Sequence, residues 1–243
     1  TDDSVDTNRT LVYKEAQFYM IAVSALIITF ALAVIYHPVG NTPALEGEVT
    51  RPLAAIPIFL YGLYLFIQWQ DVSEYDGGET PTDIDVPRQW VKLAAGLVVI
   101  LVAVEQLVGA VESLNSFFDI PAFLAGVTII AAATSLPDGI ISVRAARSGE
   151  GLTSLGNVLG SNTFDLLMAI PVGVLIAGSA PVSFAVAAPM MGVLTAATIL
   201  LFTVLRTDLT LTEAESYALL FAYVLFVAWI VAETTGVTGV LSV

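Results

Sequence analysis

Residues 122–178 read AFLAGVTIIAAATSLPDGIISVRAARSGEGLTSLGNVLGSNTFDLLMAIPVGVLIAG, two apolar runs joined by a short segment that contains two arginines. The runs, 122–143 and 153–178, are long enough for helices that cross a bilayer, which takes about 20 apolar residues. Asp138 and Asp165 lie inside these runs, and an ionisable residue at membrane depth is a candidate functional residue by default. The stretch therefore predicts two membrane-spanning helices that carry acidic groups.

Five further apolar runs surround this pair, at residues 17–37, 53–70, 91–112, 183–205 and 216–241. The chain is 57% hydrophobic and 12% charged, whereas soluble domains are about 45–50% apolar and about 25% charged. We therefore predict an all-α polytopic membrane protein with seven transmembrane helices, and we exclude a water-soluble enzyme. The chain has no cysteine and a single histidine, His37, so neither a thiolate site nor a multi-histidine metal site is expected, and no resident cofactor.

The basic residues are distributed unevenly between the two faces that seven alternating spans would create. Arg51 alone falls on one face. The other face receives Arg9, Lys14, Arg88, Lys92, Arg144, Arg147 and Arg206. Because basic residues accumulate in cytoplasmic loops, this bias predicts a cell-membrane protein with a cytoplasmic N-terminus and an extracellular C-terminus. The partner of the chain is the lipid bilayer, and the net charge of −14 leaves no basic patch for nucleic acid.

Most of the acidic residues lie in loops, above all in an acidic cytoplasmic linker at residues 71–90. Residues 70–85 hold six acids and no base but lack the order of ligands found in an EF-hand loop, so we interpret them as a solvated linker. The excess of acids over bases indicates a halophilic source. Seven spans could also indicate a retinal protein, but Lys14 and Lys92 lie at the edges of spans, where no Schiff base could form inside a helix.

A proline interrupts the fourth span beside several polar groups. Pro137 lacks an N–H, so the carbonyl of Ala133 loses its helical partner and neighbouring carbonyls loosen. Bare carbonyls in hydrocarbon are costly unless they line a cavity or meet a cation. The hard oxygens gathered around this predicted break come from Ala131, Thr134, Ser135 and Asp138. The alternative is an ordinary proline kink in which the hydroxyls bond back to the backbone.

The fifth span repeats the pattern of small and polar residues. Ser161 and Asp165 are four residues apart and share one helix face. Gly156 and Gly160 form a small-xxx-small surface that permits close helix approach. This surface would bring Ser161 and Asp165 towards Asp138.

Other polar groups in the spans have more ordinary interpretations. For Asn157 and Asn162 we favour hydrogen bonds between helices over direct ligation of an ion. For Glu105 we favour a structural bond to a neighbouring helix, and its role stays open. Glu233 lies near the outer end of the last run, where it would face water.

The fourth and fifth spans resemble the second α-repeat of the Ca2+/cation antiporter superfamily, whose best-known branch is the sodium/calcium exchangers. The residues that carry this resemblance are Thr134–Asp138, Ser142, Ala145, Ala146, Gly149 and Gly156–Asp165. The resemblance covers about 40 residues closely, and it implies a ten-helix fold made of two inverted five-helix repeats. It also implies a set of cation ligands in this chain, namely the Ala131 carbonyl with Thr134, Ser135, Asp138, Ser161 and Asp165. Two residues depart from the family pattern, because Ala133 replaces a common Gly and Asp138 replaces the commoner Glu.

By the same resemblance the chain corresponds to helices four to ten of the ten-helix plan. The implied segments are a cytoplasmic N-terminal segment at 1–16, two helices that end the first repeat at 17–70, the acidic linker at 71–90, and the second five-helix repeat at 91–243. A faint echo at an offset of 160 residues aligns Leu65, Phe66 and Trp69 with Leu225, Phe226 and Trp229. We therefore expect a three-helix N-terminal fragment of the same exchanger, which carries the first α-repeat, as a partner.

The implied function is secondary active antiport of Na+ against Ca2+ by alternating access, with this chain supplying half of the site. Asp at position 138 is more typical of potassium-dependent exchangers, so K+ stays possible as a third transported ion. The alternatives are an H+/cation exchanger and a non-transporting membrane subunit that keeps the motif for helix packing. None of these readings makes the chain an enzyme.

Overall fold

A computed structural model of the chain describes residues 5–9, 11–40, 45–74, 85–118, 122–207 and 209–239. Within these residues, seven helical segments are long and apolar enough to cross a membrane, as the sequence predicts. They are Tyr13–Tyr36, Arg51–Asp71, Val86–Leu114, Phe123–Arg147, Gly151–Ala177, Phe184–Arg206 and Glu213–Thr234. The prediction of an all-α polytopic membrane protein is confirmed.

Three of the seven spans combine α-helix with a π-helical turn. The first joins η1 (Leu11–Glu15) to α1 (Ala16–Tyr36). The fourth joins α4 (Ala122–Ala125), η2 (Gly126–Ile130) and α5 (Ala131–Arg147). The fifth joins α6 (Gly151–Phe164), η3 (Asp165–Ala169) and α7 (Ile170–Ala177). The other four are α2 (Arg51–Glu74), α3 (Val86–Phe118), α8 (Phe184–Arg206) and α9 (Glu213–Thr234).

Contacts within the chain define two compact units. Unit 1 comprises Thr1–Ile67 and Pro137–Val243, and unit 2 comprises Gln68–Leu136. One boundary falls inside α2 and the other inside α5, between Leu136 and Pro137. The fourth-span motif is therefore divided, with its hydroxyl residues in unit 2 and its acid in unit 1.

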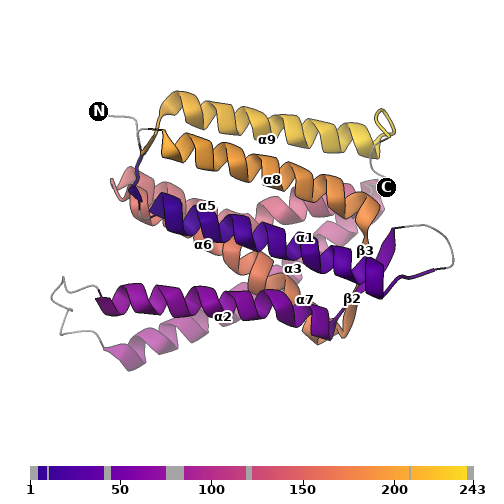
Figure 1. Cartoon of the computed structure of the whole chain (residues 1–243), viewed down its shortest axis with the longest axis horizontal. Helices are drawn as coiled ribbons and strands as arrows, with labels where there is room; N and C mark the ends of the chain where they lie inside the picture. The colour runs from indigo at the N-terminus through magenta and orange to yellow at the C-terminus, as the bar shows by residue number, and fades with distance from the viewer. Residues whose placement is uncertain are drawn as a thin grey trace. The chain divides into compact units, whose positions relative to one another are not determined.

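The core of unit 1 forms around α1, which packs against α6, η3 and α8 (Figure 1). These helices are apolar over most of their length, so packing of large aliphatic side chains against one another holds them together. Leu26 of α1 is 2% exposed, Leu159 of α6 is 1% exposed and Leu167 of η3 is fully buried. The fully and nearly buried members of this core cluster are Tyr19, Ala22, Val23, Ala25, Leu26, Leu159, Leu166 and Leu167.

Two short antiparallel ribbons join the ends of the spans in unit 1. β2 (Glu46–Thr50) pairs with β3 (Ser179–Ser183), and β1 (Val5–Asp6) pairs with β4 (Thr210–Leu211). The first ribbon lies where α1 ends and α8 begins, and the second lies at the opposite ends of these helices (Figure 1). The ribbons thus pair loops that an alternating path of seven spans assigns to the same face.

The β2–β3 ribbon is packed directly on the end of α1. A Cβ atom added to Gly47 would lie 2.6 Å from backbone atoms of Ala33 and Val34, so only glycine fits there without displacing the ribbon. Arg51, the single base that the sequence assigns to this face, donates a 3.1 Å hydrogen bond from Nε to the carbonyl of Leu175 in the last turn of α7. A cation at a helix C-terminus also complements the helix dipole.

The helix break predicted at Pro137 does not occur, because α5 continues through this residue to Arg147. Spanning helices tolerate proline where other groups satisfy the freed carbonyl, and Pro57 and Pro189 likewise lie inside α2 and α8. The irregular backbone of the fourth span is the π-helical turn η2, which ends just before Ala131.

The last span ends earlier than the apolar run indicates. α9 stops at Thr234, and Gly236, with φ of 74°, follows shortly after, as is common where a helix ends in the left-handed region. The expectation that Glu233 faces water is wrong, because this residue is 4% exposed and its carboxylate accepts a hydrogen bond from Thr238. Of the predicted acidic linker, residues 75–84 lie outside the described residues.

Candidate cation site

Residues Ala131–Asp138 form the first two turns of α5 and carry four of the predicted ligands. The hydroxyl of Thr134 donates to the carbonyls of Ile130 and Ala131, at 3.0 and 3.1 Å. This is the back-bonding that the sequence offered as the alternative to a broken helix. A hydroxyl that donates its only proton to the backbone keeps both lone pairs for another partner, so back-bonding leaves the Thr134 oxygen able to ligate a cation.

The fifth span places its two predicted ligands at a change of helix type. Ser161 lies in α6 and its hydroxyl donates to the carbonyl of Val158 at 3.3 Å. Asp165 is the first residue of the π-helical turn η3. Such turns insert one extra residue into a helix and occur frequently at functional sites.

Asn157 connects the two motif helices inside unit 1. Its side-chain amide on α6 donates to the carbonyl of Asp138 at 3.3 Å and to the hydroxyl of Ser142 at 3.0 Å, both on α5. The predicted hydrogen bond between helices is therefore confirmed for Asn157. It is wrong for Asn162, whose amide donates to the carbonyl of Val158 in its own helix at 2.7 Å.

Asp138 lies in α5 and Asp165 is the first residue of η3, so the two acids come from consecutive spans. Both residues belong to unit 1, where the Asn157 side chain joins α5 to α6 at the Asp138 carbonyl. Negative charges at membrane depth need a counter-charge, and a bound cation would supply it. The described residues contain no group of three or more acidic or histidine side chains that could hold a metal ion without further ligands.

None of the six predicted ligand residues is buried. Thr134, Ser135 and Asp165 are exposed, and Asp138 and Ser161 are partly buried. Ala131 is exposed as well. Because hydrocarbon offers no hydrogen bonds, exposed polar groups inside a span must meet water or polar groups of another segment.

Two buried polar residues of the spans were not predicted from the sequence. Tyr19 of α1 and Thr198 of α8 are 6% and 4% exposed. Tyr19 belongs to the same core cluster as Leu166, the residue after Asp165, and the hydroxyl of Thr198 donates to the carbonyl of Leu194 at 2.7 Å. Tyrosine and threonine are common in spans, so neither residue stands out without knowledge of its neighbours. The one available signal was that both interrupt otherwise apolar helices.

The close helix approach predicted at the small-xxx-small surface is absent at Gly160. Among the described residues, no atom lies within 4 Å of a Cβ added there. Helix contact between α5 and α6 instead uses the Asn157 bridge. Glu105 is exposed on α3, and the described part of the chain gives it none of the helix-to-helix bonds that we favoured.

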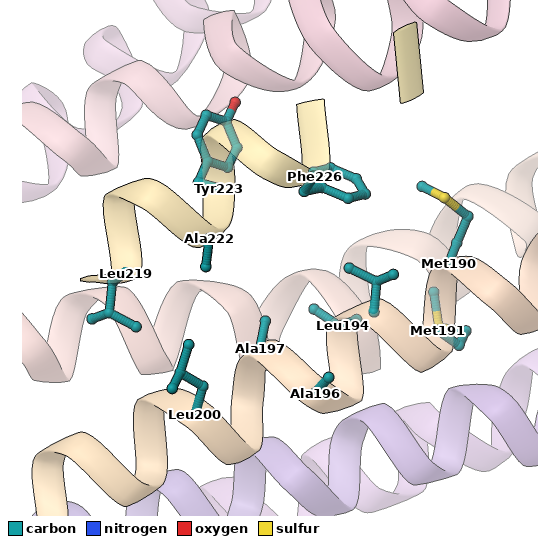
Figure 2. A pocket seen from close by; sticks show the side chains of 11 residues that line it. Met190, Met191, Leu194, Ala196, Ala197, Leu200, Leu219, Ala222, Tyr223 and Phe226 are labelled. Atoms are coloured by element: carbon teal, nitrogen blue, oxygen red, sulfur yellow. The ribbon is translucent and has the colours of Figure 1, made fainter. Parts of the chain in front are cut away.

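A separate cavity of about 530 Å³ lies between α8 and α9 in unit 1 (Figure 2). Its lining is almost entirely apolar, including Met190, Leu194 and Phe226, and the Tyr223 hydroxyl is the only side-chain hydroxyl among the lining residues. Hard cations take oxygen ligands, so this cavity cannot hold one. The oxygen-rich region at Asp138 and Asp165 remains the candidate cation site.

The chain matches the model of the family described as "Sodium/calcium exchanger protein" over residues 88–232, more than half of its length. It is 31% identical to "Putative antiporter CaxA" of Alkalimonas amylolytica over 65% of this chain and 53% of that protein. It is 26% identical to "Inner membrane protein YrbG" of Escherichia coli over 60% of this chain and 48% of that protein.

A shorter match covers the motif region of a human protein, "Sodium/potassium/calcium exchanger 5", with 44% identity over 25% of this chain and 12% of that protein. The chain spans about half the length of the first two relatives. No solved structure matches it. The family match covers both motif helices with Asp138 and Asp165, and the chain belongs to the sodium/calcium exchanger protein family.

Proposed function

We propose that the chain supplies the second-repeat half of the cation site in an antiporter that exchanges Na+ for Ca2+. The observation that carries this proposal is that Asp138 and Asp165 come from consecutive spans of unit 1, which the Asn157 side chain joins by hydrogen bonds to the Asp138 carbonyl and the Ser142 hydroxyl. Ca2+ takes 6–8 oxygen ligands and tolerates irregular geometry. Family membership and a relative named as an antiporter support the same class of transport.

The two carboxylates explain how one site could serve both ions. One Ca2+ or two Na+ would neutralise the charge of Asp138 and Asp165, so Ca2+ and Na+ would compete for the same two carboxylates. An empty site keeps two negative charges at membrane depth, and the cost of moving them through the apolar layer opposes crossing without a cation. Alternating access with either load then couples inward Na+ flow to Ca2+ extrusion.

The remaining oxygens of the proposed site come from α5 and α6. Thr134 and Ser135 would offer hydroxyl oxygens, Ala131 its carbonyl and Ser161 its hydroxyl. These groups are exposed or only partly buried, so they are accessible to an ion and to the ligands that complete its shell.

We further propose that the missing ligands come from a three-helix N-terminal fragment that carries the first α-repeat. The exposed polar groups of Thr134, Ser135 and Asp165 support this partner, because they require polar cover inside the membrane. Mass spectrometry of the protein purified from its native membrane tests the proposal. Recovery of such a fragment in equal amounts supports it, and its absence from a preparation that still transports contradicts it.

The proposed orientation puts the N-terminus in the cytoplasm and the C-terminus outside. It rests on the seven basic residues that fall on one face of the path against Arg51 on the other. Protease accessibility of a tag placed after residue 239 in sealed cells tests this orientation. Cleavage from the outside is expected, and a tag that is protected until the cells are opened contradicts it.

The decisive experiment measures 45Ca2+ uptake into Na+-loaded membrane vesicles that contain the complete protein as it is encoded. Diluting these vesicles into Na+-free medium should drive Ca2+ in. Asp138→Asn and Asp165→Asn should each reduce uptake at least tenfold. Glu150→Gln is the matched control, because it neutralises an exposed acid in the turn between α5 and α6 and should leave uptake unchanged.

Three outcomes would redirect the proposal. Uptake driven by a pH jump and not by Na+ would identify an H+/cation exchanger. Normal uptake by both Asn variants would remove the acids from the site. A protein that moves no cation under any gradient would be the non-transporting membrane subunit.

Potassium dependence is the second candidate, and the shorter acid at position 138 favours it. Asp138 reaches less far than the Glu that is commoner in the resembling motif, which leaves room for an additional ion. Relatives named sodium/potassium/calcium exchangers match the chain at 44% and 31% identity over 61 and 130 residues. Adding K+ to the 45Ca2+ medium should stimulate uptake several-fold if K+ is co-transported, and Asp138→Glu should reduce that stimulation.

A further inference from the structure

The cavity between α8 and α9 has no part in the proposed cation site, and its lining restricts what can fill it (Figure 2). Its volume of about 530 Å³ lies within the range of small-molecule binding sites. A water molecule in a cavity needs about two to four polar partners, and the lining side chains offer one hydroxyl, that of Tyr223. Water is therefore excluded as a stable occupant.

The cavity is also unsuited to staying empty. Side chains that face a void lose dispersion contacts, and the cost grows with the volume of the void. Leu200 and Tyr223 in the lining are 38% and 55% exposed, so the space is open to its surroundings. The lining segments, 190–200 and 219–226, lie in the middle of two spanning helices. At that depth the surroundings are hydrocarbon, and the occupant is therefore apolar.

The dimensions of the cavity distinguish between two apolar occupants, a helix and a lipid chain. The α8 side of the lining, residues 190–200, is about 15 Å long at the helical rise of about 1.5 Å per residue. Over that length the volume of about 530 Å³ corresponds to a cross-section of about 35 Å². A helix with its side chains is about 10–12 Å wide, which is about 80–110 Å² in cross-section. A further helix is too wide for this space, whereas a single extended hydrocarbon chain is not.

The side chains around the cavity suit a flexible apolar ligand. Figure 2 shows Ala197 of α8 and Ala222 of α9 directed into the gap from opposite sides, and these small residues leave the space open. Met190 and Met191 line the same cavity. Methionine side chains are unbranched and adapt to irregular shapes, so the lining can follow a chain that bends.

We propose that this cavity binds the hydrocarbon chain of one membrane lipid. Among the described elements, α8 is the only one with which α9 has more than marginal contact, and Figure 1 shows the two helices side by side. A chain in the cavity fills the interface between them and makes dispersion contacts with both. The lipid is thus a structural ligand that holds α9 to the rest of unit 1, and it binds independently of any cation.

Native mass spectrometry of the purified complete protein tests the proposal. The probe is a phosphatidylglycerol that carries two bromine atoms on one acyl chain, added after delipidation in detergent. We expect one probe molecule per chain to be retained at collision energies that remove all others. Ala222→Phe places a ring in the cavity and should lose this molecule. Ala228→Phe is the matched control, because Ala228 is exposed on α9 outside the lining, and it should retain the molecule.

Trp229 reports where the probe binds. Its ring centroid lies 6.3 Å from that of Phe226, which lines the cavity, so bromine atoms in the cavity should quench its fluorescence. The other two tryptophans, Trp69 and Trp90, are replaced by phenylalanine for this measurement. Quenching should saturate at one probe molecule per chain, and the additional change Ala222→Phe should abolish the saturable part.

Thermal unfolding gives a third readout, because a ligand that binds only the folded protein raises the melting temperature. The probe should raise the melting temperature of the wild type and of Ala228→Phe, and should leave that of Ala222→Phe unchanged. If Ala222→Phe does not fold, Ala197→Leu fills the cavity from the facing helix and is held to the same expectations.

Three results would overturn the proposal. They are a wild type that retains no probe, equal retention by the wild type and the filled variant, and quenching of Trp229 that never saturates. A complete protein in which the proposed N-terminal fragment covers the cavity would give the first of these. None of the readouts depends on Na+ or Ca2+, so the lipid site stands or falls separately from the proposed exchange.

Discussion

The fourth and fifth spans carry similar motifs, yet the structure surrounds them differently. In the most apolar 18-residue stretch of the Gly151–Ala177 span, 33% is buried. In the corresponding stretch of the Phe123–Arg147 span, only 6% is buried. On α6 and η3 the residues Leu155, Leu159 and Leu167 are buried in unit 1, whereas α5 buries only Ser142 and Ala145.

This difference indicates that the two halves of the site are held by different means. The turn that begins at Asp165 is anchored by the aliphatic core that it builds with α1, α6 and α8, in which Leu166 and Leu167 are buried. Asp138 is fixed to that core through the polar bridge of Asn157 to its carbonyl and to Ser142. Apolar packing should therefore contribute most of the free energy that holds the Asp165 half of the site in place. Hydrogen bonding should contribute most of the free energy that holds the Asp138 half.

Leu167→Ala should produce the largest loss of stability. Leu167 is fully buried in η3, so removing three carbon atoms creates a cavity and costs about 2–4 kcal/mol of unfolding free energy. Leu136→Ala on α5 is the control, because Leu136 is 61% exposed and lipid replaces its contacts. Unfolding in detergent followed by circular dichroism measures both, and similar costs for the two variants would refute the contrast between the spans.

Gly47→Ala extends the comparison to the end of α1, where unit 1 is also closely packed. The added methyl group would meet the backbone of Ala33 and Val34 at 2.6 Å, and such overpacking costs about 1–3 kcal/mol. Gly62→Ala on α2 is matched to it, since no atom within the described structure lies within 4 Å of that position. Gly47→Ala should therefore melt at a lower temperature than Gly62→Ala in thermal unfolding. Equal melting temperatures would show that the β2–β3 ribbon moves to accommodate the methyl group without cost.

Asn157→Ala addresses the polar attachment of α5. The loss of its bonds to Asp138 and Ser142 should cost about 1 kcal/mol, a typical sum for two hydrogen bonds between spanning helices. Asn162→Ala should cost less, because that amide bonds within its own helix. The functional readout is 45Ca2+ affinity, which should fall for Asn157→Ala and stay near wild type for Asn162→Ala; equal affinities of the two variants would contradict the bridge.

The sequence predicts those features that recur along one helix. Apolar runs of about 20 residues identify all seven spans. The hydrogen bond between helices that we favoured for two asparagines is present for Asn157 and absent for Asn162. The π-helical turns η2 and η3 cannot be recognised from the sequence in this way. One inserted residue only rotates the side chains that follow it around the helix axis, and in a helix that is apolar on all faces this rotation does not change the hydropathy pattern. The helix break predicted at Pro137 is wrong for a related reason, because one missing N–H does not end a long helix.

Contacts between distant segments could not be predicted from one sequence. β2 and β3 are five residues each and pair across more than a hundred positions, so neither carries the turn signal of a hairpin. Tyr19 and Thr198 are equally distant along the chain, and each alone is an ordinary residue of a span. The burial of both side chains therefore emerges only when α1 and α8 are placed together.

Gly160→Ala gives the smallest expected effect and tests the open side of the fifth span. No atom of the described residues lies within 4 Å of the added methyl group, and alanine is favoured over glycine inside a helix by up to about 1 kcal/mol. The variant should therefore be slightly more stable than wild type in thermal unfolding. Gly109→Ala on α3 has the same open surroundings and serves as the control.

The sign of the Gly160 effect distinguishes two states of this surface. A small gain for both variants means that the Gly156–Gly160 face meets only lipid or water. A loss for Gly160→Ala with a gain for Gly109→Ala means that another helix packs on this face, because a methyl group blocks the close approach that small residues permit. In that case the same variant should also weaken retention of the proposed N-terminal fragment during purification, which would place the partner beside Asp165.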